Sequence, residues 1–474
     1  MRRAAAALAR RAGATWPPAT RTLATTTTTA PPPPPDAAAA ALQAAQAADG
    51  LDFGDGRRLP YTTALAFYGG PGRPAAPPGG GPIPAYWTMD GAGADIAGSP
   101  PVPHDFADQA AAVAVYAAMA RLQVMDTLFF EAQRQGRFSF YMTAAGEEAA
   151  TVASAAALAP DDPVFAQYRE HGVLLARGAP LAEMADQCFG NGRDRGKGRQ
   201  MPIHYGDPGR AFHTVSSPLA TQLPHAVGAA YAGKLWGQGV GPGAPTAPGA
   251  TVVAAYFGEG AASEGDFHAA LNFAAVLRAP VVFICRNNGW AISTPAAQQY
   301  AGDGIAGRGP AYGVPATRVD GGDARAVHAG VAAARALALD TGGPALVECV
   351  AYRAGHHSTS DDAGRYRSPA GAGGGGGGGA WRARDPAARF ARWLEGRGWW
   401  DGEREAELRR SARAEAVDAL AAAEKEPKCV RPRGGDREGE RGRGRMERVR
   451  PTLLTRAPLD PSRSHAQGPA RLHV

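Results

Sequence analysis

The stretch FGEGAASEGDFHAALNFAAVL, residues 257–277, sets a glutamate between two glycines ahead of a run rich in small residues. The apolar run TVVAAYF (251–257) leads into this stretch and is typical of a strand that is covered on both faces of a sheet. Ser263 and Asp266 have the spacing of a capping box, which predicts a helix that begins near Ser263. Glu259 therefore lies in the turn between a strand and the N-terminus of a helix.

Strands and helices alternate from this stretch towards the C-terminus. Two further apolar runs, PVVFICR (280–286) and PALVECVAYR (344–353), predict buried strands. Helices are predicted over 106–136, 146–158, 263–277, 323–339 and within 385–426. This alternation predicts an α/β fold with a mostly parallel sheet flanked by helices.

Polar residues follow the predicted strands, at the edge where parallel sheets bind ligands. Glu259 follows the first strand, and Asn288 and Trp290 follow the second in the segment CRNNGWAIST. A helix N-terminus preceded by glycines attracts an anion such as phosphate. Because a lone carboxylate would repel a phosphate, Glu259 indicates a divalent cation between them, and Mg²⁺ prefers oxygen ligands of this kind. Arg286 could pair with a diphosphate.

A glutamate between glycines followed by two asparagines resembles the signature of thiamine-diphosphate enzymes. The wider sequence is similar to alpha subunits of branched-chain 2-oxo acid dehydrogenases over about residues 105–426. Blocks such as SFYMTAAGEEAATVASAAAL, VFAQYREHGVLL, SSPLATQLPHAVGAAYA and YRAGHHSTSDD carry this resemblance. It implies the thiamine-diphosphate-binding fold and oxidative decarboxylation of branched-chain 2-oxo acids, with transfer of the acyl group to a lipoyl arm.

The resemblance also implies a role for particular residues. Mg²⁺ would be bound by the side chains of Glu259 and Asn288 and by the carbonyl of Trp290, where the family has tyrosine. The family's potassium site matches Ser216, Pro218, Thr221 and Gln222. Contacts to thiamine diphosphate would come from Gln167, Tyr168, Arg169, Ser217, Leu219, Gly260, Ala261, Arg286 and His357.

The segment GHHSTSDD would carry the remaining chemistry. His357 matches the family's catalytic histidine, and we expect it to act as an acid or hydrogen-bond donor that titrates near neutral pH. Ser358 and Ser368 match sites that a regulatory kinase phosphorylates in the family. A phosphatase would remove these phosphates. Phosphate on Ser358 would add negative charge beside His357 and block access of the lipoyl arm.

The composition divides the chain into four segments. Residues 1–35 are rich in arginine and hydroxyl residues and contain no acid. This composition predicts a mitochondrial transit peptide and a matrix location. The alternative is a disordered tail. Residues 36–104 predict an extended arm with little core, and residues 105–426 the catalytic domain. Residues 427–474 differ from the family's assembly region, so they are either a disordered tail or a gene-model error.

Charge and composition exclude other classes. The formal charge of +6 combines +5 from the first 35 residues and +7 from residues 427–474 (12 basic against 5 acidic), which leaves 6 − 12 = −6 for the body. Such a body is not a nucleic-acid surface. The sequence contains no run of 18 apolar residues, so it predicts no membrane-spanning segment. Its four scattered cysteines suit a reducing compartment.

The resemblance implies that this chain is half of an active site. A beta subunit would complete it in an α2β2 heterotetramer, and an acyltransferase core would supply the lipoyl arm. Two departures concern the loops: TAAGEE replaces the family's TNYGEE, and a glycine run occupies 371–379. A related pyruvate or acetoin dehydrogenase subunit, or a non-catalytic product that fails to assemble, are the alternatives.

Overall fold

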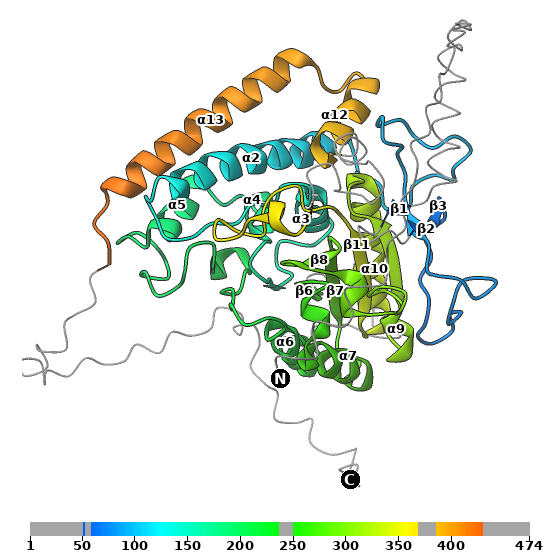
Figure 1. Cartoon of the computed structure of the whole chain (residues 1–474). Coiled ribbons are helices and arrows are strands. Elements are labelled where there is room, and N and C mark those ends of the chain that lie inside the picture. The colour runs from blue at the N-terminus through cyan, green and yellow to red at the C-terminus, as the bar shows by residue number, and fades with distance from the viewer. Residues whose placement is uncertain (1–50, 53–57, 237–249, 368–384, 430–474) are drawn as a thin grey trace, which may run out of the picture. The chain divides into compact units, whose positions relative to one another are not determined.

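One parallel sheet organises the chain, of which the computed structural model describes residues 51–52, 58–236, 250–367 and 385–429 (Figure 1). Seven strands follow the order β3-β4-β10-β11-β7-β6-β5, and each neighbouring pair is parallel. Their bounds are Tyr61–Thr62 (β3), Ala85–Tyr86 (β4), Val164–Phe165 (β5), Val253–Gly258 (β6), Val281–Asn287 (β7), Ala316–Asp320 (β10) and Ala345–Val350 (β11). The predicted α/β fold is confirmed.

The three strands predicted from sequence are neighbours at the middle of this sheet. Strand β7 lies between β6 and β11, with Gly258 opposite Arg286 and Asn287 opposite Val350. Since the strands are parallel and in this register, the residues that follow them meet at one edge of the sheet.

Helices cover both faces of the sheet, because successive strand side chains point to opposite sides. Tyr256 and Ile284 belong to the core formed with α2, α3, α10 and α13, whereas Phe257 and Cys285 belong to the core formed with α6 and α7. Figure 1 shows α6 and α7 on the opposite side of the sheet from α2 and α13. These helices are Gln109–Arg134 (α2), Glu148–Ala156 (α3), Gln222–Leu235 (α6), Gly265–Leu277 (α7), Ala324–Thr341 (α10) and Gly402–Lys425 (α13).

Shorter elements complete the description. The remaining α-helices are His171–Ala176 (α4), Leu181–Phe189 (α5), Ala296–Gln299 (α8), Arg308–Ala311 (α9) and Pro386–Gly396 (α12). The 3-10 helices are Pro208–Arg210, Ala261–Ser263 and Ala363–Arg365. Two antiparallel pairs are Leu51–Asp52 (β1) with Arg58–Leu59 (β2), and Trp290–Ala291 (β8) with Thr294–Pro295 (β9).

Helix α2 is the one helix among the described residues whose length and apolar composition would let it cross a membrane. It buries Tyr116, Leu122 and Phe129 in the protein core and runs beside α13 (Figure 1). Length and composition alone are weak evidence for a membrane span, and this packing is that of a core helix.

One local expectation is wrong. Ser263 does not cap α7: the segment Ala261–Ser263 forms a 3-10 turn, α7 begins at Gly265, and the hydroxyl of Ser263 donates to Gln299. The described part of residues 36–104, expected to contain little core, buries Ile83, Tyr86 and Met89, and β3 and β4 extend the sheet. The segment boundaries stay predictions, and residues 1–35, 237–249 and 430–474 lie outside the described part.

Candidate active site

Glu259 follows β6 directly and is almost fully buried, with 1% of its surface exposed. Its Oε2 accepts a hydrogen bond from the backbone N–H of Asn288 (3.3 Å), whereas its Oε1 is buried without a partner. Burial raises the pKa of this carboxyl to about 7, and the charge of Glu147 adds to the shift. A buried carboxylate oxygen without a donor is the arrangement expected of a cation ligand.

Asn288 reaches the same place from the end of β7. Its Nδ2 donates to Oε1 of Glu147 (3.0 Å), and its Oδ1 accepts from the backbone N–H of Trp290 (3.1 Å). The carbonyl of Trp290 lies 3.4 Å from a guanidinium nitrogen of Arg353. The turns after β6 and β7 therefore bring Glu259 against Asn288, and Asn288 against Trp290, which fits the predicted Mg²⁺ ligands.

Glu147 is a site residue that the sequence analysis missed. It is fully buried, forms an ion pair with Arg286, and lies 3.7 Å from the Nε of Arg169. Burial opposes its ionisation, but Arg286 and Arg169 outweigh this effect and lower its pKa. Its sequence context, GEEAA, is also an ordinary helix start, so its role was not recognisable from sequence alone.

Arg169 and Arg286 are buried side by side around Glu147. Arg169 donates to the carbonyls of Thr143 (2.5 Å) and His357 (2.9 Å). Arg286 forms ion pairs with Glu147 and Glu170. Both guanidinium groups thus already have protein partners, and their contact with a diphosphate stays a prediction.

His357 is placed against these arginines. Its Nδ1 lies 3.3 Å from Arg169 and 3.4 Å from Arg353, and the edge of its ring approaches Tyr168. Guanidinium groups only donate, so Nδ1 must accept and the proton sits on Nε2. Burial, reinforced by these two positive charges, lowers the pKa of His357 to about 3. The pKa of His357 thus lies far below the neutral range expected from the residue type, and the neutral imidazole carries its proton on Nε2.

This assignment can be tested by the ¹⁵N NMR spectrum of histidine-labelled, cofactor-free protein. We expect the His357 signals to show a neutral ring with the proton on Nε2 down to about pH 5, because protonation would add a charge beside two guanidinium groups. His357→Gln identifies the signals. A titration with a midpoint near pH 6 would contradict the assignment.

The predicted potassium ligands converge at the start of α6. The hydroxyl of Thr221 lies 3.1 Å from the hydroxyl of Ser216 and 3.0 Å from the carbonyl of Pro218. Gln222 donates to the carbonyl of Tyr256 (2.8 Å), and its own Oε1 is buried without a partner. These oxygen atoms, one of them buried and unpaired, suit a monovalent cation.

The other predicted cofactor residues surround the same edge. Gln167 accepts from the backbone N–H of Gly258 (3.0 Å), and Ser217 bonds to Nε2 of His204 (2.5 Å). A Cβ at Gly260 would lie 2.7 Å from the Cβ of Ala291, so the turn after β6 leaves no room for a side chain there. Ala261 is buried and Leu219 packs against the second core.

Comparison with known proteins identifies the family. The family model for the dehydrogenase E1 component matches residues 116–430. The alpha 2 subunit of mitochondrial 2-oxoisovalerate dehydrogenase from Arabidopsis thaliana is 51% identical over 346 residues, 73% of this chain and 69% of that protein. The corresponding human alpha subunit is 49% identical over 349 residues, 73% of this chain and 74% of that protein. The chain belongs to the dehydrogenase E1 component family.

The Caenorhabditis elegans alpha subunit of the same name is 49% identical over 323 residues, 68% of this chain and 71% of that protein. Membership in the E1 component family implies thiamine diphosphate as the cofactor. It also places the chain in a complex with a beta subunit and an acyltransferase core.

Of the two predicted phosphorylation sites, Ser358 lies within the described residues. Ser358 is 6% exposed, and its hydroxyl accepts from the backbone N–H of Ser360 (3.2 Å). Neighbouring Thr359 exchanges hydrogen bonds with Tyr141, which fastens the segment to the domain. A kinase could reach Ser358 only after this segment opens. Ser368 lies outside the described residues.

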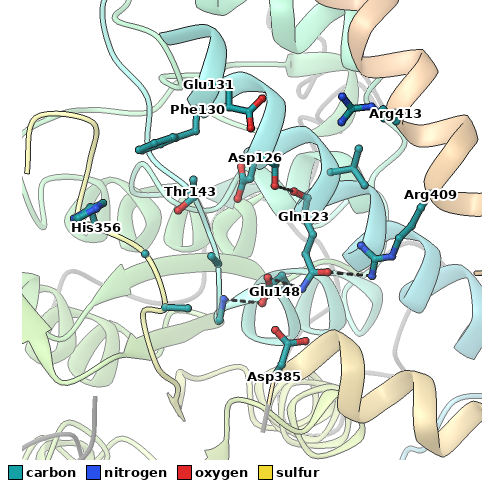
Figure 2. Close-up of a pocket in the computed structure, with 16 residues that line it drawn as sticks. Gln123, Asp126, Phe130, Glu131, Thr143, Glu148, His356, Asp385, Arg409 and Arg413 are labelled. Atoms are coloured by element: carbon teal, nitrogen blue, oxygen red, sulfur yellow. Dashed lines mark hydrogen bonds between the residues drawn. The ribbon is translucent and has the colours of Figure 1, made fainter. Parts of the chain in front are cut away.

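A cavity of about 690 Å³ is lined by Thr143, Ala145, Gly146 and Glu148, which flank Glu147 in the chain (Figure 2). Glu148 lies in its wall, where Gln123 (3.1 Å) and the backbone N–H of Gly146 (2.9 Å) donate to it. Burial, with the nearby charge of Asp385, raises the pKa of Glu148 to about 8. Figure 2 shows Asp385 beside Glu148. Burial therefore favours the protonated form of this carboxyl in the folded protein.

The raised pKa makes stability depend on pH. Stability linked to Glu148 is fully present below its unfolded value of about 4.5 and is lost as pH rises through about 8. We expect Glu148→Gln, a mimic of the protonated carboxyl, to flatten the fall of the melting temperature between pH 5.5 and 8.5. At pH 8.5 the variant should be more stable than wild type by on the order of 2 kcal/mol. Glu131→Gln, an exposed carboxyl of the same cavity, should leave the pH profile unchanged.

Proposed function

We propose that this chain is the alpha subunit of a mitochondrial branched-chain 2-oxo acid dehydrogenase (3-methyl-2-oxobutanoate dehydrogenase), with thiamine diphosphate bound through Mg²⁺. The observation that carries the proposal is the buried, unpartnered Oε1 of Glu259 at the end of β6, within one hydrogen bond of Asn288. The names of its relatives, at about half identity over most of both chains, supply the substrate class.

Each side chain has a task in this site. Glu259, Asn288 and the carbonyl of Trp290 would hold Mg²⁺, and Arg169 and Arg286 would face the diphosphate. When bound, thiamine diphosphate supplies the electron sink that decarboxylation of a 2-oxo acid requires. The neutral imidazole of His357 would donate a hydrogen bond from Nε2 to the substrate or to the acyl group on its way to the lipoyl arm.

The loop before α6 would be steadied by a bound K⁺ ion. Its ligands would be Ser216, Pro218, Thr221 and Gln222, whose buried Oε1 is unpaired. Ser217 and Leu219 stand in the same loop, so a cation there would fix the two residues expected to touch the cofactor.

The proposed assembly is an α2β2 heterotetramer in the mitochondrial matrix. The beta subunit would complete the active site, and a lipoyl-bearing acyltransferase core would accept the acyl group. A kinase and a phosphatase would act on Ser358 and Ser368. Phosphate on buried Ser358 would release the segment that carries His357, because it adds about −1.5 to −2 charge to a closed space.

Co-expression of residues 36–474 with the cognate beta subunit tests the proposal. We expect a heterotetramer that decarboxylates 3-methyl-2-oxobutanoate in preference to pyruvate, and only when thiamine diphosphate and Mg²⁺ are both supplied. Preference for pyruvate or acetoin would replace the branched-chain assignment by that of a related enzyme. A chain that neither assembles nor turns over would indicate a non-catalytic product.

A further inference from the structure

Glu147 holds a position in the site that none of the predicted roles explains. It directly precedes α3, is fully buried, and its two oxygens are divided between different partners. Oε2 pairs with Arg286, and Oε1 accepts from the amide Nδ2 of Asn288 and lies 3.7 Å from Arg169. One carboxylate thus touches both groups expected to face the diphosphate and one group expected to hold the metal.

When Glu259 is ionised, as a cation ligand must be, the buried charges around Glu147 balance. The guanidinium groups are Arg169, Arg286 and Arg353, and the carboxylates are Glu147, Glu170 and Glu259. None of the six is more than 2% exposed. Buried charges are screened little, so a diphosphate that entered alone would meet little net positive charge. A divalent cation would supply the missing charge.

Glu147 also fixes the orientation of the Asn288 amide. A carboxylate can only accept, so it selects the NH₂ side of that amide and turns the oxygen away from itself. A neutral glutamine in its place could donate as well as accept, and would no longer distinguish the two sides of the amide.

We propose that Glu147 is a positioning residue that makes diphosphate binding depend on a divalent cation. It cancels positive charge on Arg169 and Arg286, which lowers affinity for the diphosphate alone, and it presents the amide of Asn288 for metal binding. This inference rests on the proposed function, since it concerns the same site.

The test is calorimetric titration of thiamine diphosphate into the assembled wild-type and Glu147→Gln tetramers, each with excess Mg²⁺ and with EDTA. The measured quantity is the ratio of the dissociation constants without and with Mg²⁺. We expect Glu147→Gln to reduce this ratio at least tenfold, through tighter binding in EDTA and weaker binding with Mg²⁺. A residue that only supports the fold would weaken both and leave the ratio unchanged.

Two further variants make the result decisive. Glu148→Gln changes the adjacent buried acid, which touches neither arginine nor Asn288, and should keep the wild-type ratio. Glu147→Asp keeps the charge and should also keep a ratio within about threefold of wild type; it decides the question if Glu147→Gln does not assemble. An unchanged ratio in Glu147→Gln, or a collapsed ratio in Glu147→Asp, overturns the inference. Failure of the wild-type tetramer to bind thiamine diphosphate with Mg²⁺ would instead refute the proposed function.

Discussion

Replacement of Glu259 by glutamine should greatly reduce Mg²⁺-dependent decarboxylation while leaving the metal-free protein intact. The carboxylate would supply one of the negative oxygens that hold Mg²⁺, and a metal contact of this kind contributes several kcal/mol. We therefore expect turnover of 3-methyl-2-oxobutanoate to fall by on the order of 10³. Mg²⁺ with thiamine diphosphate should also no longer raise the melting temperature of the variant.

The behaviour of the metal-free protein distinguishes a ligand from a structural residue. Glu259 has an unpartnered oxygen, and its raised pKa means that its contribution to stability is lost as pH rises through about 7. Without metal at pH 8, Glu259→Gln should thus be at least as stable as wild type. A clear drop in melting temperature there would show that the carboxylate supports the fold. Glu264→Gln, an exposed acid five residues on, should retain both activity and metal response.

The proximity of Glu259 and Asn288 could be predicted from sequence because it depends only on two neighbouring strands. Continuous apolar runs gave β6 and β7, and parallel strands that neighbour one another place the residues after them at one edge. Glu259 and Asn288 needed no further information to be brought together. The expected capping box does not form, because the hydroxyl of Ser263 donates a hydrogen bond to Gln299, 36 residues further along the chain.

The residues that were missed depend on distant partners. Glu147 meets Arg286 and Asn288 across 139 and 141 residues of sequence, and nothing in GEEAA encodes either contact. Strand β10, with the sequence ATRVD, escaped notice because it is short and contains charges. Arg318 is nevertheless buried there, since it pairs with Glu348 on the neighbouring strand β11. Buried charge that is paired in space interrupts the apolar pattern on which strand prediction relies.

The histidine shows the same limit for electrostatics. The segment GHHSTSDD placed His357 in the site but indicated nothing of Arg169, 188 residues away, or of the burial that keeps the ring neutral. Residue identity predicted a group able to exchange protons near neutral pH. The surroundings, which only the fold assembles, lower the pKa of this imidazole far below that range.

Replacement of Gly146 by alanine should unfold or displace the loop that carries Glu147. The backbone of Gly146 has a φ of +85°, and a Cβ there would lie 2.0 Å from the carbonyl oxygen of Tyr352. No rotamer relieves that overlap, because both atoms belong to the backbone framework. The Tyr352–Ala354 segment would have to move, and the bond from its N–H at Ala354 to the carbonyl of Ala145 would break.

Gly136 provides the matched control for this substitution. Its φ of +78° is similar, but a Cβ there would meet nothing within 4 Å. Gly136→Ala should therefore cost only the backbone strain of about 1 kcal/mol. Gly146→Ala should cost on the order of 3–5 kcal/mol and abolish binding of thiamine diphosphate with Mg²⁺, since Glu147 and Arg353 lie on the two displaced segments. Thermal melting and calorimetric titration of both variants measure the difference. Equal losses would mean that the loop yields freely, and that the close approach of residues 146 and 352 does not hold the site together.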